Sequence, residues 1–217
     1  MAVPRPEPRL IAAAAGALVL LLAAIGLIIT LTGDRGLTPA QYERLVTSGS
    51  LAGVPNDVTH GPGRPIIDLD QQRASYLGAA RCTTYWSAAQ QHLLSQSSHL
   101  PVGAAADESL VQSFGTELWD DPAAAQTAMT DWTVCLDEFQ SLSPSASAKL
   151  KVVARGTASG VAWQYSANFD FDSPLHLLIL RDRNVIATFD LPDAPDPGWR
   201  AQLAEAFHAD VEAASRS

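Results

Sequence analysis

An uncharged run of 23 residues, which begins at Leu10 and ends at Thr32, constrains this chain more than any other feature. At about 1.5 Å per residue, a helix of this length extends roughly 34 Å and can cross a hydrocarbon core of about 30 Å. Arg5 and Arg9 precede the run, so the positive-inside rule places the N-terminus in the cytoplasm. We therefore predict a single-pass protein of the cell membrane, with a cytoplasmic N-terminus at residues 1–9, a transmembrane helix at 10–32, a linker at 33–37 and an extracytoplasmic domain at 38–217.

A cleaved signal peptide is the alternative interpretation of residues 10–32. The apolar core of a signal peptide is usually about 7 to 15 residues long and ends at a small-x-small cleavage site. Here the core is longer, and it ends in the sequence Thr-Leu-Thr-Gly-Asp at residues 30–34. The sequence therefore favours a retained anchor and leaves cleavage open.

The charge of the outer part limits its partners. With Arg5, Glu7 and Arg9 set aside, 12 basic residues face 22 acidic ones, a net charge of −10. An acidic surface repels nucleic acids and anionic lipid head groups. We therefore expect no nucleic-acid partner, and contact with the membrane through residues 10–32.

The two cysteines, Cys82 and Cys135, both fall in the outer part. In an oxidising compartment an even pair of cysteines is bridged more often than free, and closing this loop stabilises the fold by about 4 kcal/mol in the chain-entropy model. Both cysteines lie on the apolar sides of predicted helices. We therefore predict a disulfide that ties two neighbouring helices together, and not a catalytic thiol.

Apolar residues recur at helical spacing in several segments, and capping residues mark where three of these helices begin. Thr38, Pro39 and Gln41 form a capping box, and Asp-Pro pairs stand at residues 121–122 and 196–197. The predicted helices cover residues 39–46, 70–96, 122–139 and 197–214.

Strand signals alternate with these helices and follow them. The predicted strands cover residues 108–119, 150–154, 161–171, 175–180 and 185–191. Alternation at 161–171 indicates one buried and one wet face, whereas 175–180 is apolar at nearly every position, as expected of a strand covered on both sides. The whole order predicts an α+β fold: an antiparallel sheet with disulfide-linked helices packed on one face.

Residues 48–65 are dense in glycine and proline, which predicts a loop. A long loop is a candidate lid or binding loop, and a plain surface loop is the alternative.

Residue chemistry gives no clear active site. His92 and His99 are too far apart on one helix to share a metal, and Asn168, Asp170 and Asp172 resemble a calcium loop that lacks its glycine and its bidentate glutamate. The Gly/Ser segment at 156–160 fits a hairpin better than a nucleophile elbow. We therefore predict no catalytic residue, no metal and no cofactor. The candidates for lining a ligand cleft, with core packing as the alternative, are Trp86, Trp132, Trp163 and Tyr165.

The order of these features resembles a known family. Cys82 and Trp86 lie in one helix, Phe114 in a strand, Cys135 in an alanine-rich helix after Trp132, and a hairpin with the sequence Asn-Val-Ile at 184–186 precedes a closing amphipathic helix. This order is similar to the extracellular sensor domain of the actinobacterial PknH-type serine/threonine kinase. The resemblance implies a sheet with disulfide-tethered helices and a cleft for an unidentified extracellular ligand. This chain departs from the family in having two cysteines, where the kinase sensor has a second disulfide, and with residues 1–9 before the predicted membrane helix we expect no kinase on the cytoplasmic side.

Three functions follow as hypotheses. The first is a non-enzymatic, membrane-anchored sensor-like binding domain for a cell-envelope ligand, small or lipid-like, or for a partner protein. The second is a cell-envelope hydrolase that uses carboxylates the sequence does not identify. The third is a structural accessory subunit of a membrane complex.

Overall fold

The computed structural model describes residues 35–102, 111–142, 151–167 and 176–217. The helices are α2 (Pro39–Val46), α3 (Leu69–Ser75), α4 (Ala80–His92), α6 (Pro122–Leu142) and α7 (Pro197–Ser215). The strands are β1 (Ser50–Leu51), β2 (Val54–Gly63), β3 (Leu93–Pro101), β4 (Ser113–Trp119), β5 (Lys151–Ala158), β6 (Val161–Ala167), β7 (His176–Asp182) and β8 (Val185–Leu191).

The strands form one sheet in the order β1-β2-β3-β4-β8-β7-β6-β5, and every neighbouring pair is antiparallel. Strands β4 and β8 at its centre join the two halves of the chain. The predicted α+β class with an antiparallel sheet is confirmed.

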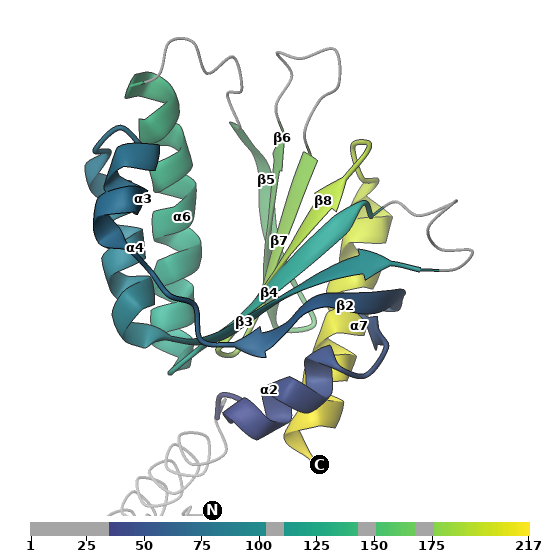
Figure 1. Ribbon diagram of the computed structural model, residues 1–217. Coiled ribbons are helices and arrows are strands. Elements are labelled where there is room, and N and C mark those ends of the chain that lie inside the picture. Colours follow the sequence, from purple (N-terminus) through teal and green to yellow (C-terminus); the bar gives the residue numbers. More distant parts are fainter. Residues whose placement is uncertain (1–34, 103–110, 143–150, 168–175) are drawn as a thin grey trace, which may run out of the picture. The chain divides into compact units, whose positions relative to one another are not determined.

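Helices cover both faces of the sheet (Figure 1). Strand β7 shows the division, because Leu178 and Leu180 pack in the cluster that contains α2 and α7, whereas Ile179 packs in the cluster that contains α4 and α6. Successive side chains of a strand point to opposite faces, so an apolar strand needs cover on both sides. The prediction of helices on one face holds for the disulfide-linked pair α4 and α6 but is wrong for α2 and α7.

The same double cover corrects the prediction for β6. Gln164 and Ser166, expected on a wet face, are 4% and 3% exposed because α6 lies over them. The Gln164 Nε2 donates to Thr133 Oγ1 of α6 at 2.7 Å, so this buried amide is paired.

The predicted loop at 48–65 is wrong, since this segment forms the edge strands β1 and β2. Gly49 and Gly53 adopt positive φ in the turns on either side of β1. Two of the glycines on which the loop prediction was based therefore form turns next to a strand. The remaining proline and glycine residues are tolerated because β2 pairs irregularly with β3, with register shifts after Val58 and His60.

The predicted helix at 70–96 is two helices, α3 and α4, and it ends earlier than expected, because β3 begins at Leu93. The buried positions of β3 alternate as Leu93, Ser95, Ser97 and His99. Three of these four are polar, so this strand carries no hydrophobic alternation that a sequence pattern could reveal.

The predicted helix starts are confirmed. Thr38 and Gln41 form the capping box of α2, with Thr38 N donating to Gln41 Oε1 at 2.9 Å. Asp121 Oδ1 accepts from the backbone N–H groups of Ala123 and Ala124, and Asp196 caps α7. The predicted Cys82–Cys135 disulfide is also present, between α4 and α6.

Residues 10–32 lie outside the described residues. Within the four described ranges, no helix is both long enough and apolar enough to span a membrane.

Candidate functional site

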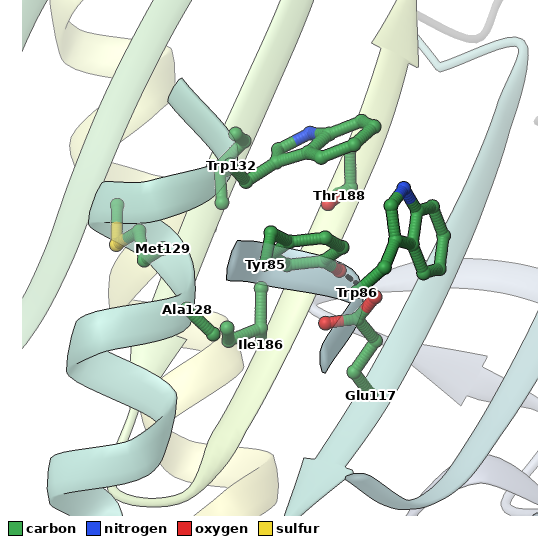
Figure 2. Close-up of a pocket in the computed structure, with 9 residues that line it drawn as sticks. Tyr85, Trp86, Glu117, Ala128, Met129, Trp132, Ile186 and Thr188 are labelled. Atoms are coloured by element: carbon green, nitrogen blue, oxygen red, sulfur yellow. Dashed lines mark hydrogen bonds between the residues drawn. The ribbon is translucent and has the colours of Figure 1, made fainter. Parts of the chain in front are cut away.

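A pocket lies where α4 and α6 meet the sheet (Figure 2). Its volume is about 160 Å³ and it is partly open to solvent. The lining residues come from α4, from α6 and from strands β4, β7 and β8; they are Tyr85, Trp86, Glu117, Ala128, Met129, Trp132, Ile179, Ile186 and Thr188. We call this cavity the aromatic pocket.

Three aromatic side chains form one wall of the aromatic pocket. The ring centroids of Tyr85 and Trp86 are 5.0 Å apart at an interplanar angle of 78°, and those of Tyr85 and Trp132 are 4.9 Å apart at 42°. Trp86 and Trp132 complete the group in an edge-to-face arrangement at 6.1 Å. These distances lie in the favourable range for aromatic pairs, so the wall is held by its own packing.

Helical spacing explains why these rings gather here. In α4, Tyr85 and Trp86 follow Cys82 by three and four residues, and in α6, Trp132 precedes Cys135 by three. Residues at these separations share a helix face. The disulfide therefore brings the aromatic faces of the two helices together.

Alanines determine how closely α6 approaches the sheet. Ala125 and Ala128 are buried at the N-terminal half of α6, where the strands present Ile179 and Ile186. Larger residues, Met129 and Trp132, follow along the helix. The small side chains allow the start of α6 to pack closely against the sheet, and the pocket lies next to this contact.

Glu117 is the single ionisable carboxylate among the lining residues. Its Oε1 accepts from the Tyr85 hydroxyl at 3.0 Å, and its Oε2 accepts from Trp119 Nε1 at 3.0 Å. Figure 2 shows the Tyr85 hydroxyl directed at this carboxylate. Burial raises the pKa of Glu117 above its usual range, and the hydrogen bonds from Trp119 and Tyr85 oppose that rise.

No cationic partner neutralises Glu117 in the described part of the chain, since none of the ion pairs found there includes it. Both donors to its oxygens are neutral. A partly buried carboxylate thus faces a mostly apolar cavity with hydrogen bonds but without an opposite charge, which is an unfavourable state for an anion.

A second pocket of about 200 Å³ adjoins the first, and Met129 lines both. It is more polar, with Gln126 and Thr130 from α6 and with Arg155 and Gln164 from β5 and β6. Arg155 Nε donates to Gln164 Oε1 at 3.0 Å. The crevice between α6 and the sheet therefore has an aromatic part with a carboxylate and a polar part with a guanidinium.

The structure separates the four predicted cleft residues. Trp86 and Trp132 lie together in the aromatic pocket. Trp163 and Tyr165 instead pack in the cluster on the α7 face, where the Arg200 guanidinium lies 5.1 Å and 5.3 Å from their ring centroids. Trp163 also borders the second pocket, but it does not share a cavity with the other two tryptophans.

The sequence did not single out Tyr85, Glu117, Met129 or Thr188 as site residues. Glu117 did carry a signal, because it stands next to Leu118 in a predicted strand and therefore points to the opposite face. Only the positions of α4 and α6 show that this opposite face is enclosed.

Ser97, His99 and Asn56 form a hydrogen-bonded chain like that of a hydrolase triad. Ser97 Oγ lies 2.8 Å from His99 Nε2, and His99 Nδ1 lies 2.9 Å from Asn56 Oδ1. These residues are only 3%, 1% and 4% exposed, and the hydroxyl of Tyr42 from α2 covers Ser97 at 3.3 Å. Since a substrate cannot reach the serine, we interpret this chain as a satisfied polar network of the core.

Other acidic side chains have structural roles, and one predicted feature lies outside the described residues. Asp120 pairs with His92, Asp121 caps α6, and Asp190 accepts from Ser113. Among the described residues, no three His, Cys, Asp or Glu side chains gather in a way that would hold a metal ion. The calcium-like residues Asn168, Asp170 and Asp172 lie outside the described ranges.

Comparison of the chain with known protein families, characterised proteins and solved structures finds no match. The function must therefore be argued from the site itself.

Proposed function

We propose that this chain is a membrane-anchored, extracytoplasmic binding domain that holds a small cell-envelope molecule in the aromatic pocket. One observation carries the proposal: an open cavity is walled by Tyr85, Trp86 and Trp132 and contains a single carboxylate, that of Glu117. Mostly apolar cavities with a few convergent polar groups are the usual form of small-molecule sites.

The size of the aromatic pocket limits what it can hold. An engineered protein cavity of about 150 Å³ accepts one benzene molecule, whereas pockets for drug-sized ligands measure about 300–1,000 Å³. At about 160 Å³, the aromatic pocket fits a single ring or a short branched group. The polar pocket beyond Met129 offers room for a hydrophilic remainder of the same ligand.

The arrangement favours binding over hydrolysis. Glycoside hydrolysis in most families needs two carboxylates on opposite sides of the scissile bond. Glu117 has no second carboxylate among the residues that line either pocket. The hydrolase hypothesis therefore has less support than the binding hypothesis.

The resemblance of the sequence to the sensor domain of the PknH-type kinase agrees with this proposal. That resemblance rests in part on the disulfide-linked helices that carry Trp86 and Trp132, and these helices wall the pocket. The expected transmembrane helix would then keep the domain, with its ligand, at the outer surface of the membrane.

Native mass spectrometry of the full chain, extracted from its own membrane, tests the proposal. Thr188 of β8 lines the pocket, and its partner on the neighbouring strand β4 is Gly115, which has no side chain. A larger side chain at position 188 therefore has room to enter the cavity. We expect a bound small molecule on the wild-type protein and none on Thr188→Phe. The matched control is Thr157→Phe, the same change at an exposed position of β5, which should keep the ligand.

Two results would contradict the proposal. One is a wild-type chain that carries no small molecule, or that carries only a partner protein. The other is a ligand retained equally by Thr188→Phe. Thermal unfolding of each variant shows whether the substitution has damaged the fold.

A further inference from the structure

The carboxylate of Glu117 is the strongest indication of what the aromatic pocket binds. It is partly buried, it accepts hydrogen bonds only from the neutral donors Tyr85 and Trp119, and no ion pair includes it among the described residues. A carboxylate in such a place is stabilised by any cation that enters beside it.

The walls of the pocket suit a cation as well. Lysine, arginine and histidine are absent from the nine lining residues, so no protein charge repels or replaces an incoming one. The faces of tryptophan and tyrosine rings carry negative electrostatic potential and attract ammonium groups, which is the basis of aromatic cages for quaternary ammonium ligands. Tyr85, Trp86 and Trp132 supply three such rings.

The geometry argues against two other cations. A divalent metal needs several oxygen ligands, and the pocket offers one carboxylate. A guanidinium binds a carboxylate best through two parallel hydrogen bonds, and each oxygen of Glu117 already has one of its two acceptor sites occupied, by Tyr85 or by Trp119, which leaves fewer orientations for such a pair of bonds. A compact ammonium group is stabilised by lying close to the Glu117 carboxylate and to the aromatic rings, and it does not require two parallel hydrogen bonds to the carboxylate oxygens.

We infer that the aromatic pocket recognises a small organic ammonium ion, held over the faces of Tyr85, Trp86 and Trp132 and paired in charge with Glu117. This inference rests on the proposed function and names the chemical class of its ligand. The acidic outer part of the chain, with its net charge of −10 once Arg5, Glu7 and Arg9 are set aside, also draws cations toward the site.

Calorimetric titration of the full chain with two matched probes tests this inference. Choline carries a trimethylammonium group, and 3,3-dimethyl-1-butanol has the same shape with carbon in place of the charged nitrogen. We expect choline to bind the wild-type protein at least about tenfold more tightly than the alcohol, since a desolvated cation–π contact together with a facing carboxylate accounts for a difference of that order.

Substitution of the carboxylate locates the effect. In Glu117→Gln the preference for choline should fall by about three- to fivefold, because the cation–π contact remains, while binding of the alcohol shows that the variant is folded. The matched control is Glu205→Gln, an exposed glutamate of α7, which should keep the full preference.

The outcomes separate this inference from the proposed function. Equal affinity for the two probes overturns the ammonium assignment and leaves a neutral ligand for the pocket. Failure of both probes to bind, while native mass spectrometry finds a ligand that Thr188→Phe loses, overturns the assignment alone. Failure of both probes and no pocket-dependent ligand overturns the inference and the proposed function together. The first of these cases is decided by the two probes on wild-type protein alone.

Discussion

The disulfide between Cys82 and Cys135 joins α4 to α6 one helical turn from the aromatic pocket. The two Cα atoms are 4.4 Å apart. Tyr85 follows Cys82 by three residues, and Trp132 precedes Cys135 by three, so each half of the bridge shares a helix face with a ring that walls the pocket. The disulfide fixes the separation of the two helices at the place where the ligand is proposed to bind.

Replacement of both cysteines tests this role. Cys82→Ser with Cys135→Ser should lower the free energy of unfolding by about 4 kcal/mol, because the 53-residue separation makes a long loop whose closure restricts the unfolded chain. Urea unfolding of the oxidised wild type, the reduced wild type and the double variant measures the change. Equal stability of all three, or alkylation of either thiol in native, unreduced protein, would contradict the account.

Glu117 should contribute little to stability, because its burial without a cation offsets its two hydrogen bonds. We expect the free energy of unfolding of Glu117→Gln to be equal to that of the wild type or up to about 1 kcal/mol higher, as is common where a site residue serves binding rather than folding. Urea unfolding at neutral pH gives the comparison. A loss of more than about 1 kcal/mol would instead make Glu117 a structural residue, since removal of a well-paired buried group is destabilising by that amount or more.

Asn184 connects the start of the domain to the hairpin of β7 and β8. Its Oδ1 accepts from Leu37 N at 2.6 Å, and its Nδ2 donates to Leu37 O at 3.0 Å and to Trp119 O at 2.7 Å. Asn184→Asp keeps the shape but removes the donor to both carbonyl groups. We expect a loss of about 2–4 kcal/mol at neutral pH, measured by chemical unfolding, because two buried acceptors lose their partner and a charge is buried.

A matched substitution controls for the loss of a single surface amide. Gln112 is exposed, and Gln112→Glu changes an amide to a carboxylate in the same way. It should alter stability by no more than about 0.5 kcal/mol. A similar effect of the two substitutions would mean that Asn184 does not hold Leu37 in solution.

His99 makes the fold sensitive to acid. Burial lowers the pKa of His99 from 6.5 to about 4, so the native state keeps the imidazole neutral while the unfolded chain takes up a proton below about pH 6.5. The unfolded state binds more protons than the native state between pH 6.5 and 4. The contribution of His99 to the free energy of unfolding is therefore fully present above pH 6.5 and is lost as the pH falls toward 4. Between pH 7 and 5 the loss should be about 2 kcal/mol.

The comparison with His99→Gln isolates this effect. Burial raises the pKa of Glu117 and of Asp210, and these groups act in the opposite direction at acid pH, so the wild type alone is not a clean measure. The difference in slope between wild type and His99→Gln, measured by urea unfolding at several pH values, removes their contribution. Parallel pH profiles for the two proteins would show that His99 is accessible to protons in the native state.

Much of the fold was predictable where burial is apolar and capping is local. The bounds of β8 and the starts of α2, α6 and α7 follow from alternating apolar residues and from capping side chains a few positions away. Strands β2 and β3 were not predictable, because the buried positions of β3 include Ser97 and His99, whose partners Thr116 and Asn56 lie in other strands. A hydrophobic pattern in the sequence does not reveal a buried polar side chain, because the residue that forms a hydrogen bond with it lies far away in the sequence.

The site was predictable in part for a related reason. Helical spacing identified Trp86 and Trp132 on the faces that carry the cysteines, and these residues do line the pocket. Trp163 and Tyr165, which were predicted together with them, lie on the α7 face, because both faces of the sheet are covered and the sequence does not state which helix covers which face. The role of Glu117 depends on the same information.

The indole N–H signals of the five tryptophans provide the most direct test of where the ligand binds. A two-dimensional nitrogen–proton spectrum of the full chain is recorded before and after addition of a methanol extract of its own membranes. The account predicts that the signals of Trp86 and Trp132 shift or broaden, while that of Trp199 on the α7 side, which lines neither pocket, stays in place. A change at Trp199 without changes at Trp86 and Trp132, or an unchanged spectrum, would contradict the central claim that the aromatic pocket is the binding site.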